Sequence, residues 1–306
     1  MRIAVLGGGG FLGSHLVERL LGQGHRVRVL SRSLPGLLPQ ACLEHPASEA
    51  LAGLLSDGPL LERVLEGCDV VIHLVSSTLP QSSNLDPVAD VQTNLVGTLG
   101  LLAEARRAGV RRIIYLSSGG TVYGIPRQVP IPETHPTEPL CSYGITKRAI
   151  EQFLVLERHL HGLDERVVRL ANPYGERQRT SAAQGAVAVF LGKALRGEPI
   201  QLWGDGTTVR DFLHVVDATD AVLRLLDYCG EERLFNVGSG TGHSLNEVLA
   251  TIGRVTGRAL QIERGPGRSF DAPSNVLCIE RATRELGWRP QIDLEEGIRR
   301  FARSLA

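Results

Sequence analysis

The sequence shows no excess of charge of one sign. Lysine and arginine together number 33, and so do aspartate and glutamate. A chain without net charge lacks the field of one sign that attracts nucleic acid or an anionic membrane surface. We therefore expect neither partner, and a small molecule is the simpler substrate.

Closely spaced cysteines and long apolar runs are also missing. The five cysteines lie far apart, without the spacing of a zinc site or a disulfide framework. No apolar run approaches the roughly 18 to 20 residues that cross a bilayer, and residues 1–6 are too few for the core of a signal peptide. These absences predict a cytoplasmic protein with reduced thiols and no metal.

Neither a repeat nor a low-complexity tract interrupts the chain. Short β-branched runs alternate instead with segments whose apolar residues recur at helical spacing. Repeated β-α units imply an α/β fold with a Rossmann-type, doubly wound parallel sheet. Strands are expected at 2–6, 26–30, 70–75, 112–117 and 167–170, and helices at 11–21, 60–66, 91–108, 143–161 and 183–195.

The pattern changes after residue 171. Proline and glycine become frequent between 173 and 206 and again between 257 and 273, and the segments between them are too short to continue the alternation. We interpret this part as a smaller C-terminal substrate-binding lobe. The expected division is a dinucleotide-binding domain at 1–171, to which 209–240 returns, and a smaller lobe at 172–208 and 241–306.

Three glycines, Gly7, Gly10 and Gly13, lie between the first expected strand and the first helix. The missing side chains allow a tight turn, a close approach of backbone to pyrophosphate and close packing of helix on sheet. The helix N-terminus then presents its N–H groups and its positive dipole end to phosphate. This context predicts a dinucleotide site that also includes Phe11 and Leu12.

The second strand ends at Ser31 and Arg32, where an NAD-specific site usually has a carboxylate for the ribose 2′-hydroxyl. Ser31 can donate to a 2′-phosphate and Arg32 can pair with it, which slightly favours NADP over NAD. A solvated Arg32 beside an NAD ribose fits the sequence nearly as well. Asp57 accepts from the adenine amino group, or caps the helix at 60–66, or does both.

Tyr143 and Lys147 lie four residues apart, on one face of an expected helix. An ammonium near a phenol stabilises the phenolate and lowers the tyrosine pKa, which suits the pair for proton exchange with a sugar hydroxyl during hydride transfer. A surface pair is the alternative. His73, inside an apolar strand, is interpreted as a core histidine without a catalytic role.

Further motifs accompany the glycine turn and the Tyr143 pair. They are Asp69–Leu74, Asn94–Thr98, Ser117–Gly124, Arg169–Gly175, Gly204–Gly206, Arg210–Asp217 and Glu285–Pro290. With them, nearly the whole chain resembles the extended short-chain dehydrogenase/reductase family and, within it, the nucleotide-sugar epimerases and dehydratases similar to UDP-galactose 4-epimerase.

The resemblance implies NAD(P)-dependent epimerisation of a UDP-hexose or UDP-N-acetylhexosamine, in which hydride leaves C4, the 4-keto sugar rotates and hydride returns to its other face. It also implies polysaccharide biosynthesis and a homodimer formed through helices 91–108 and 143–161. An NADPH-dependent nucleotide 4-keto-sugar reductase is the alternative, favoured by Ser31 and by Gly119. A cofactor-sensing protein is the non-enzymatic alternative.

In the family, a Ser or Thr near the tyrosine hydrogen-bonds the reacting sugar oxygen, and the matching position here is Gly119. Ser118 or Thr121 would have to take over this role, and Thr121 is the preferred candidate. The dehydratases carry an Asp-Glu pair in the same loop, where this chain has Gly120 and Thr121. This difference argues against dehydration.

Binding residues complete the expectation. Besides the glycine turn, the expected cofactor contacts are Ser31, Arg32, Asp57, Leu74, Val75, Ser76, Asn94, Ser117, Tyr143, Lys147 and Ala171. The side chains of Leu74 and Val75 are better explained as core.

The resemblance also implies contacts to the nucleotide sugar. They are Asn172, the base-stacking Trp203, the diphosphate-binding Arg210 and Arg268, the ribose partner Asp271, and Asn275 beside the sugar. The alternatives are surface arginines, a core Trp203 and an Asp271 that serves only a turn. Asn275, in place of a bulky Tyr, predicts a roomy sugar pocket.

Overall fold

The structure is a computed structural model and describes residues 1–181, 185–266 and 272–306. The chain divides into two compact units. Three of the five boundaries between the units fall within β6 (Asp164–Leu170), α9 (Val215–Asp227) and β10 (Leu234–Val237). Unit 1 comprises Met1–Val122, Pro139–Arg169 and Val222–Phe235, and unit 2 comprises Tyr123–Glu138, Leu170–Ala221 and Asn236–Ala306.

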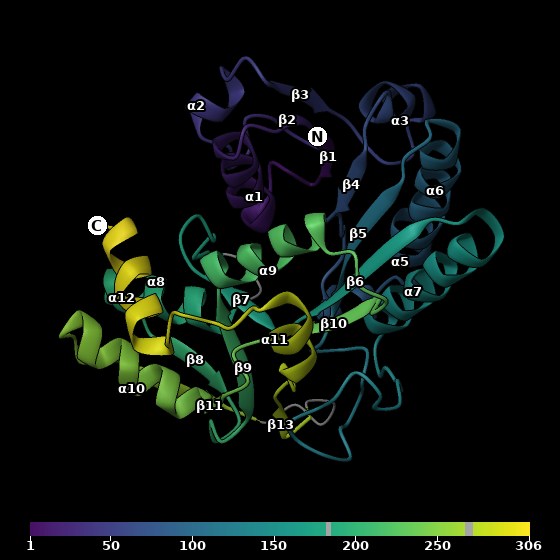
Figure 1. Cartoon of the computed structure of the whole chain (residues 1–306). Coiled ribbons are helices and arrows are strands. Elements are labelled where there is room, and N and C mark those ends of the chain that lie inside the picture. Colours follow the sequence, from purple (N-terminus) through teal and green to yellow (C-terminus); the bar gives the residue numbers. More distant parts are fainter. Residues whose placement is uncertain (182–184, 267–271) are drawn as a thin grey trace. The chain divides into compact units, whose positions relative to one another are not determined.

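A seven-stranded sheet dominates unit 1 (Figure 1). Its strand order is β10-β6-β5-β4-β1-β2-β3, and the pairs β1–β2, β1–β4, β2–β3 and β4–β5 are all parallel. The chain order reverses beside β1, as in Rossmann-type sheets. The predicted fold class is confirmed. The first five strands are β1 (Arg2–Leu6), β2 (Arg26–Ser31), β3 (Ser48–Ala52), β4 (Val70–His73) and β5 (Arg112–Ser118).

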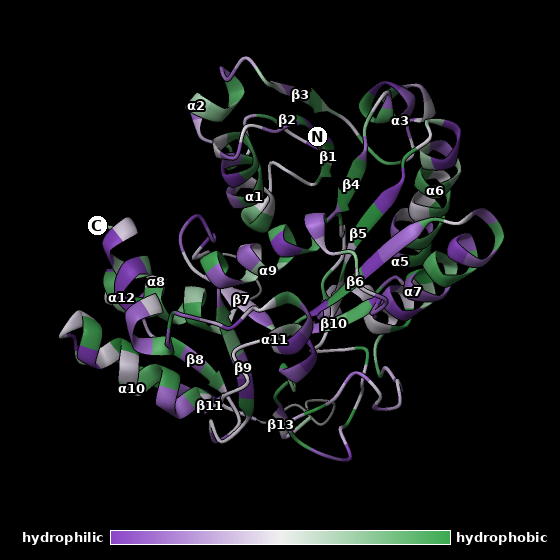
Figure 2. Cartoon of the chain, in the orientation of Figure 1, coloured by the Kyte–Doolittle hydropathy of each residue, from purple (hydrophilic) through white to green (hydrophobic). Residues whose placement is uncertain are grey.

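Apolar side chains cover both faces of this sheet, because successive residues of a strand point to opposite sides. Leu6 of β1 belongs to a buried cluster with Val64 and Leu101 from helices on one face. Val17 lies on the other face with Val29, since both would contact a Cβ placed on Gly8. Figure 2 shows hydrophobic residues along β1 and β4.

The helices of unit 1 differ from expectation mainly between β4 and α6. The strand expected at 70–75 ends at His73, because the next residues leave the sheet and approach the glycine turn. The helix expected at 91–108 begins with six π-helical residues. The helical segments are α1 (Phe11–Gly22), α2 (Gln40–Leu43), α3 (Gly58–Leu65), α4 (Pro80–Ser83), α5 (Pro87–Asp90), η1 (Val91–Val96), α6 (Gly97–Arg107) and α7 (Ser142–His161).

Unit 2 contains two small sheets and the helices that share their apolar core. One sheet has the order β11-β9-β13 with β7 beside β9, and the other pairs β12 with β8. Phe212, Val248 and Phe301 belong to the buried cluster between them. The elements are β7 (Asn172–Tyr174), α8 (Ala186–Arg196), β8 (Ile200–Trp203), β9 (Val209–His214), β11 (Gly242–Ser244), α10 (Leu245–Thr256), β12 (Ile262–Gly265), β13 (Ser274–Asn275), α11 (Glu280–Leu286) and α12 (Leu294–Ser304).

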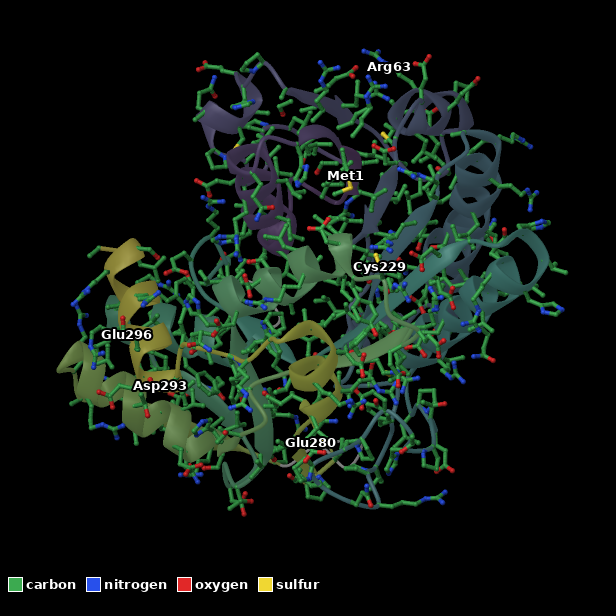
Figure 3. All side chains as sticks on the ribbon, viewed as in Figure 1. Met1, Arg63, Cys229, Glu280, Asp293 and Glu296 are labelled. Carbon is green, nitrogen blue, oxygen red and sulfur yellow. The ribbon has the colours of Figure 1, made fainter. Side chains whose placement is uncertain are left out.

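Local side chains fix the ends of these helices. Asp293 accepts a hydrogen bond from the Glu296 N–H at 2.8 Å and so begins α12, and Figure 3 labels both residues. Ser244 and Glu247 form a capping box at the start of α10. The ends of both helices are therefore encoded in their own sequence.

Several broad expectations can be compared with the structure. Within the described ranges, no helix is long and apolar enough to cross a membrane, and no group of three or more His, Cys, Asp or Glu could hold a metal ion. The segment that returns to unit 1 is Val222–Phe235, shorter than the expected 209–240. The assignment of separate functions to the two units stays a prediction.

Candidate active site

The glycine turn joins β1 to α1. Gly7 has φ +87°, a left-handed conformation that favours glycine, and its carbonyl accepts the Gly10 N–H at 3.0 Å. A Cβ on Gly13 would clash with the Gly7 oxygen, so α1 packs against the turn only because residue 13 has no side chain. α1 begins at Phe11 with no side-chain cap and no acidic residue in its first turn. This geometry fits a dinucleotide pyrophosphate.

The loop after β4 lies against the turn and is held by Asn94. Asn94 is buried on η1, and its Oδ1 accepts from the N–H and the hydroxyl of Ser77 at 2.9 and 3.2 Å. Its Nδ2 donates to Thr78 Oγ1 at 3.1 Å and to Asp90 Oδ1 at 2.9 Å. All four hydrogen-bonding positions of the amide are used. Asn94 therefore fixes the loop that contains residues 74–76, for which cofactor contacts are predicted.

β2 ends close to the glycine turn. A Cβ on Gly9 would lie 2.6 Å from Ser31 Oγ, so the two backbones run close together. Arg32 follows and is exposed. The Asp57 carboxylate accepts the Leu60 N–H at 3.1 Å and caps α3. Of the two roles considered for Asp57, the helix cap is present, and contact with adenine stays a prediction.

α7 carries Tyr143. The side chains of Ser83, in α4, and of Asn84, directly after α4, cap the first turn of α7. Cys141, the N-cap residue, makes no side-chain capping bond. Ser142 donates its N–H to Asn84 Oδ1 at 2.9 Å, and Tyr143 donates its N–H to Ser83 Oγ at 3.0 Å. The α4 region therefore sets where α7 begins, and with it the position of the Tyr143 backbone.

Burial of the phenol raises the pKa of Tyr143 to about 12. The side chains of Ser76 and Ser118, beside the phenol, act in the opposite direction without overcoming the effect of burial. The expectation of a lowered tyrosine pKa is wrong for the protein by itself, because desolvation of the phenolate dominates.

Lys147 is only 5% exposed. Its Nζ donates to the Leu116 carbonyl at 2.7 Å and lies 5.6 Å from the centroid of the Tyr143 ring. Burial lowers the pKa of Lys147 to about 8, although Glu151 and Asp90 act to raise it. The burial of the ammonium rules out the alternative of a surface pair.

The end of β5 brings Ser118, not Thr121, to the phenol. The Ser118 side chain lies beside Tyr143 and acts to lower its pKa, whereas Thr121 Oγ1 is buried and has no hydrogen-bond partner among the described residues. The Thr121 backbone lies against Gly144, where a Cβ would come within 2.9 Å of the Thr121 oxygen. The structure therefore favours Ser118 over Thr121, the candidate preferred from the sequence.

Ser117 is engaged by the protein itself. Its hydroxyl donates to Glu151 Oε1 at 2.6 Å, and Glu151 also forms a two-pronged ion pair with Arg169, at 3.0 and 2.7 Å. All three side chains are buried. The Ser117 side chain therefore supports α7, and its predicted cofactor contact is untested.

His73 fits the interpretation as a core histidine. It is buried, and its Nε2 lies 2.9 Å from the hydroxyl of Thr98, which in turn donates to the Asn94 carbonyl at 2.6 Å. Thr98 therefore accepts from a protonated Nε2. Burial, followed by the charge of Lys147, lowers the pKa of His73 to about 3. The imidazole is neutral at physiological pH.

Two predicted nucleotide-sugar residues are neighbours in unit 2. Arg210 of β9 and Asn275 of β13 are register partners. Arg210 Nη1 donates to the Val209 and Ala272 carbonyls at 2.9 and 2.7 Å, and Asn275 is buried. These backbone contacts fix the direction of the guanidinium.

The remaining predicted residues of unit 2 are spread over several elements. Asn172 of β7 donates to the Asp211 carbonyl at 2.9 Å, and Ala171 is buried. Trp203, at the end of β8, is 48% exposed, which excludes the alternative of a core tryptophan. Arg268 and Asp271 lie outside the described residues.

Comparison with known proteins identifies the family of the chain. Residues 3–238 match the model of the NAD dependent epimerase/dehydratase family. The chain belongs to this family. It is 36% identical to the UDP-glucose 4-epimerase of Mycolicibacterium smegmatis over 97% of this chain and 96% of that protein.

Two solved structures of the same kind are similar over their full length. A UDP-glucose 4-epimerase of Thermotoga maritima with UDP-glucose is 33% identical, with a TM-score of 0.94 over 100% of this chain and 98% of that one. A UDP-glucose 4-epimerase of Thermus thermophilus in complex with NAD is 33% identical, with a TM-score of 0.90 over 99% and 98%. The chain is thus an enzyme of an NAD-dependent family, and the cofactor-sensing alternative loses its support.

This epimerase/dehydratase family member also contains site residues that the sequence did not reveal. Ser83 and Asn84 cap α7, and the Asp90 carboxylate accepts from Ser142 and Thr146, which flank Tyr143. The spacing of Ser142 and Thr146 places them on one helical face, but their partner lies 52 and 56 residues away along the chain. Only the tertiary fold brings them together.

Proposed function

We propose that this protein epimerises a nucleotide sugar at C4, with a UDP-hexose or a UDP-N-acetylhexosamine as substrate. One observation carries the proposal: the Tyr143 phenol, with Ser118 beside it, lies next to the buried Lys147 ammonium, in the same unit as a glycine turn suited to a dinucleotide. The similarity to proteins named as UDP-glucose 4-epimerases supports it.

In the proposed reaction, Tyr143 exchanges a proton with the C4 hydroxyl and Ser118 hydrogen-bonds the same oxygen. Gly7, Gly10 and Gly13 would hold NAD, which when bound would supply the hydride acceptor and a positive charge. The pKa of about 12 keeps Tyr143 protonated at neutral pH in the protein alone. Phenolate formation therefore depends on positive charge near the ring, of which the chain itself supplies the Lys147 ammonium.

The amino-acid usage of the chain supports this role for Lys147. Only two of its 33 basic residues are lysines, Lys147 and Lys193. An ammonium is compact and can lose its proton when buried, whereas a guanidinium is larger and stays charged. We infer that position 147 needs a small cation that donates to the Leu116 carbonyl and still faces the Tyr143 ring.

Residues of unit 2 are proposed to recognise the nucleotide sugar. We infer that Arg210 binds the diphosphate, Trp203 stacks on the base and Asn275 lies beside the sugar, with Asn172 as a further contact. The exposed indole of Trp203 and the register pairing of Arg210 with Asn275 support this assignment. Asn275→Tyr should reduce turnover of N-acetylated substrates more than that of plain hexoses.

The function can be tested without an added reductant. Mass spectrometry identifies the cofactor that the purified protein carries, and NMR then follows UDP-glucose, UDP-galactose and their N-acetyl forms. A C4 epimerase converts a substrate to an equilibrium mixture of epimers and consumes no cofactor. A product that appears only with stoichiometric NADPH would establish the reductase alternative instead. Failure to convert any of these sugars would refute the proposal.

We propose a homodimer formed through η1, α6 and α7. Apolar side chains on these segments are exposed in the single chain, among them Val96, Ile145, Leu156 and Leu160. Ile145, Leu156 and Leu160 recur at helical spacing and form one stripe on α7. Ile145→Glu should give a monomer in sedimentation, whereas Ile262→Glu, an exposed residue of unit 2, should not. A monomeric unmodified protein would contradict the proposal.

The cellular setting is part of the same proposal. All five cysteines are free thiols, which fits a reducing compartment such as the cytoplasm. We infer that the product supplies polysaccharide synthesis. Fractionation of the source cells tests the location, and loss of a sugar from their polysaccharide on gene deletion tests the pathway.

A further inference from the structure

Asp90, at the end of α5, is a fully buried carboxylate whose partners are all neutral. Its Oδ1 accepts from the Thr78 hydroxyl and, at 2.9 Å, from Asn94 Nδ2. Its Oδ2 accepts from the hydroxyls of Ser142 and Thr146, each at 2.8 Å. Among the described residues, no cation forms an ion pair with it. A buried carboxylate without an ion-pair partner must be stabilised by its hydrogen bonds.

Four converging donors favour an ionised carboxylate at this position. Both carboxylate oxygens accept and neither carries a hydrogen. Asn94 cannot turn its amide around, because its Oδ1 already accepts the Ser77 N–H. An asparagine at position 90 can keep its oxygen toward Asn94 only if its amide nitrogen faces the hydroxyls of Ser142 and Thr146, which would then accept instead of donate. Burial alone would raise the pKa of Asp90, but the hydrogen bonds outweigh it and the pKa lies below its usual value.

The four donors come from three segments: α7, which carries Tyr143, the loop after β4, and η1. Ser142 and Thr146 flank Tyr143 on α7, one helical turn apart. Thr78 and Asn94 hold the loop that contains Ser76, whose side chain lies beside the Tyr143 phenol and acts to lower its pKa. One carboxylate thus joins the helix that carries the phenol to the loop that contacts it.

We propose that Asp90 is a positioning residue for the reaction: it aligns α7 with the loop after β4 and places a negative charge against Thr146, the neighbour of Lys147 in α7. The inference rests on the proposed function in taking Tyr143 and Lys147 as the reacting pair. Asp90 acts to raise the pKa of Lys147, and Glu151 does the same. The other ionisable groups that interact with the Tyr143 pair or with Asp90 are His73, Tyr115 and Cys141.

The scarcity of lysine makes the charge effect measurable. Lysine labelled with 13C at Cε gives two NMR signals in the full-length protein, and Lys193→Arg assigns them. We expect Lys147 to titrate near pH 8, and its pKa to fall by roughly one unit in Asp90→Asn, as expected for loss of a nearby charge. Asp86→Asn is the matched control, because Asp86 is exposed and only caps α5.

A second variant separates charge from alignment. Ser142→Ala with Thr146→Val removes two donors but keeps the carboxylate, so the Lys147 pKa should stay within about 0.3 unit. We expect kcat of the double variant to fall about tenfold, and that of Asp90→Asn to fall by the same factor. Only Asp90→Asn should shift the alkaline limb of the pH profile of kcat.

Three results would overturn the proposal. They are an unchanged Lys147 pKa in folded Asp90→Asn, an equal pKa shift in the double variant, and full kcat in the double variant. Circular dichroism checks the fold of each, and if Asp90→Asn does not fold, the double variant alone decides the alignment. The NMR titration uses no substrate, so it remains informative even if the protein proves inactive on UDP-sugars.

Discussion

The two units hold their candidate residues in different ways. Around Tyr143 in unit 1, polar side chains are buried and bonded to one another: Asp90 accepts from four donors, and Asn94 uses all four positions of its amide. In unit 2, Trp203 is half-exposed and Arg210 donates to backbone carbonyls. Proton exchange depends on fixed distances, whereas groups that recognise a ligand must remain able to reach it.

Two buried carboxylates show the same contrast. Asp90 collects side-chain donors from three segments, whereas Asp211 in unit 2 accepts mainly from backbone N–H groups, those of Ser239, Gly240 and Leu277 at 2.6, 3.3 and 3.2 Å, besides the Ser239 hydroxyl at 2.7 Å. Asp211 therefore shapes loops, and Asp90 arranges functional side chains. Substitutions in unit 1 should act on the chemical step, and those in unit 2 on substrate binding.

Tyr143→Phe should have the largest effect. Loss of the hydroxyl removes proton exchange, so kcat should fall by about 10² to 10⁴ while the bound cofactor remains. Turnover assays measure kcat, and the cofactor absorbance of the purified protein shows whether the cofactor remains bound. Tyr228→Phe, elsewhere in unit 1, should retain activity. Retained turnover in Tyr143→Phe would place the chemistry elsewhere.

Arg210→Ala tests whether residues of unit 2 act on substrate binding. A lost contact between guanidinium and phosphate is worth about 1.5 to 3 kcal/mol, so KM should rise roughly 10- to 100-fold with a much smaller change in kcat. Arg258→Ala, also in unit 2, should leave KM unchanged. If steady-state kinetics show a loss confined to kcat, Arg210 does not bind the substrate.

The pH dependence of kcat tests whether the reaction needs the Lys147 ammonium in unit 1. The lowered pKa of Lys147, about 8, means that the ammonium prevails below pH 8 and is lost above it. If the ammonium is needed, kcat should be about half-maximal near pH 8 and fall further as the pH rises. His73, with a pKa of about 3, should give no inflection near pH 6.5. A flat profile up to pH 10 would remove Lys147 from the chemistry.

Arg32→Ala should have the smallest effect, because Arg32 is exposed and solvent screens its charge. We expect NADP binding to weaken about 3- to 10-fold and NAD binding to change little, as measured by calorimetry. Equal changes for both cofactors would mean that Arg32 is a solvated surface residue and that Ser31 and Arg32 confer no preference for NADP.

Local patterns were enough to predict much of unit 1. The glycine turn, the parallel strands and the Tyr143 helix depend on residues close together in sequence, so periodicity and spacing reveal them. The end of β4 at His73 was missed, because contacts with the glycine turn decide it. The π-helical start of the helix at Val91 was missed, because the apolar spacing of a single helical turn does not distinguish π-helical from α-helical geometry. The choice between Ser118 and Thr121 depends on how the loop after β5 turns, which composition does not reveal.

The Rossmann-type sheet, the dinucleotide turn and the placing of Tyr143 and Lys147 on one helical face were predictable from the amino-acid sequence, since each follows from backbone geometry over a few residues. Contacts between distant segments place Ser118 and Ser76 beside the phenol and let one buried carboxylate hold the residues on either side of it, and these contacts were visible only in the folded chain. The physical reason is burial. Segments distant in the chain remove these side chains from water, and this sets both their hydrogen-bond partners and the direction in which each pKa shifts.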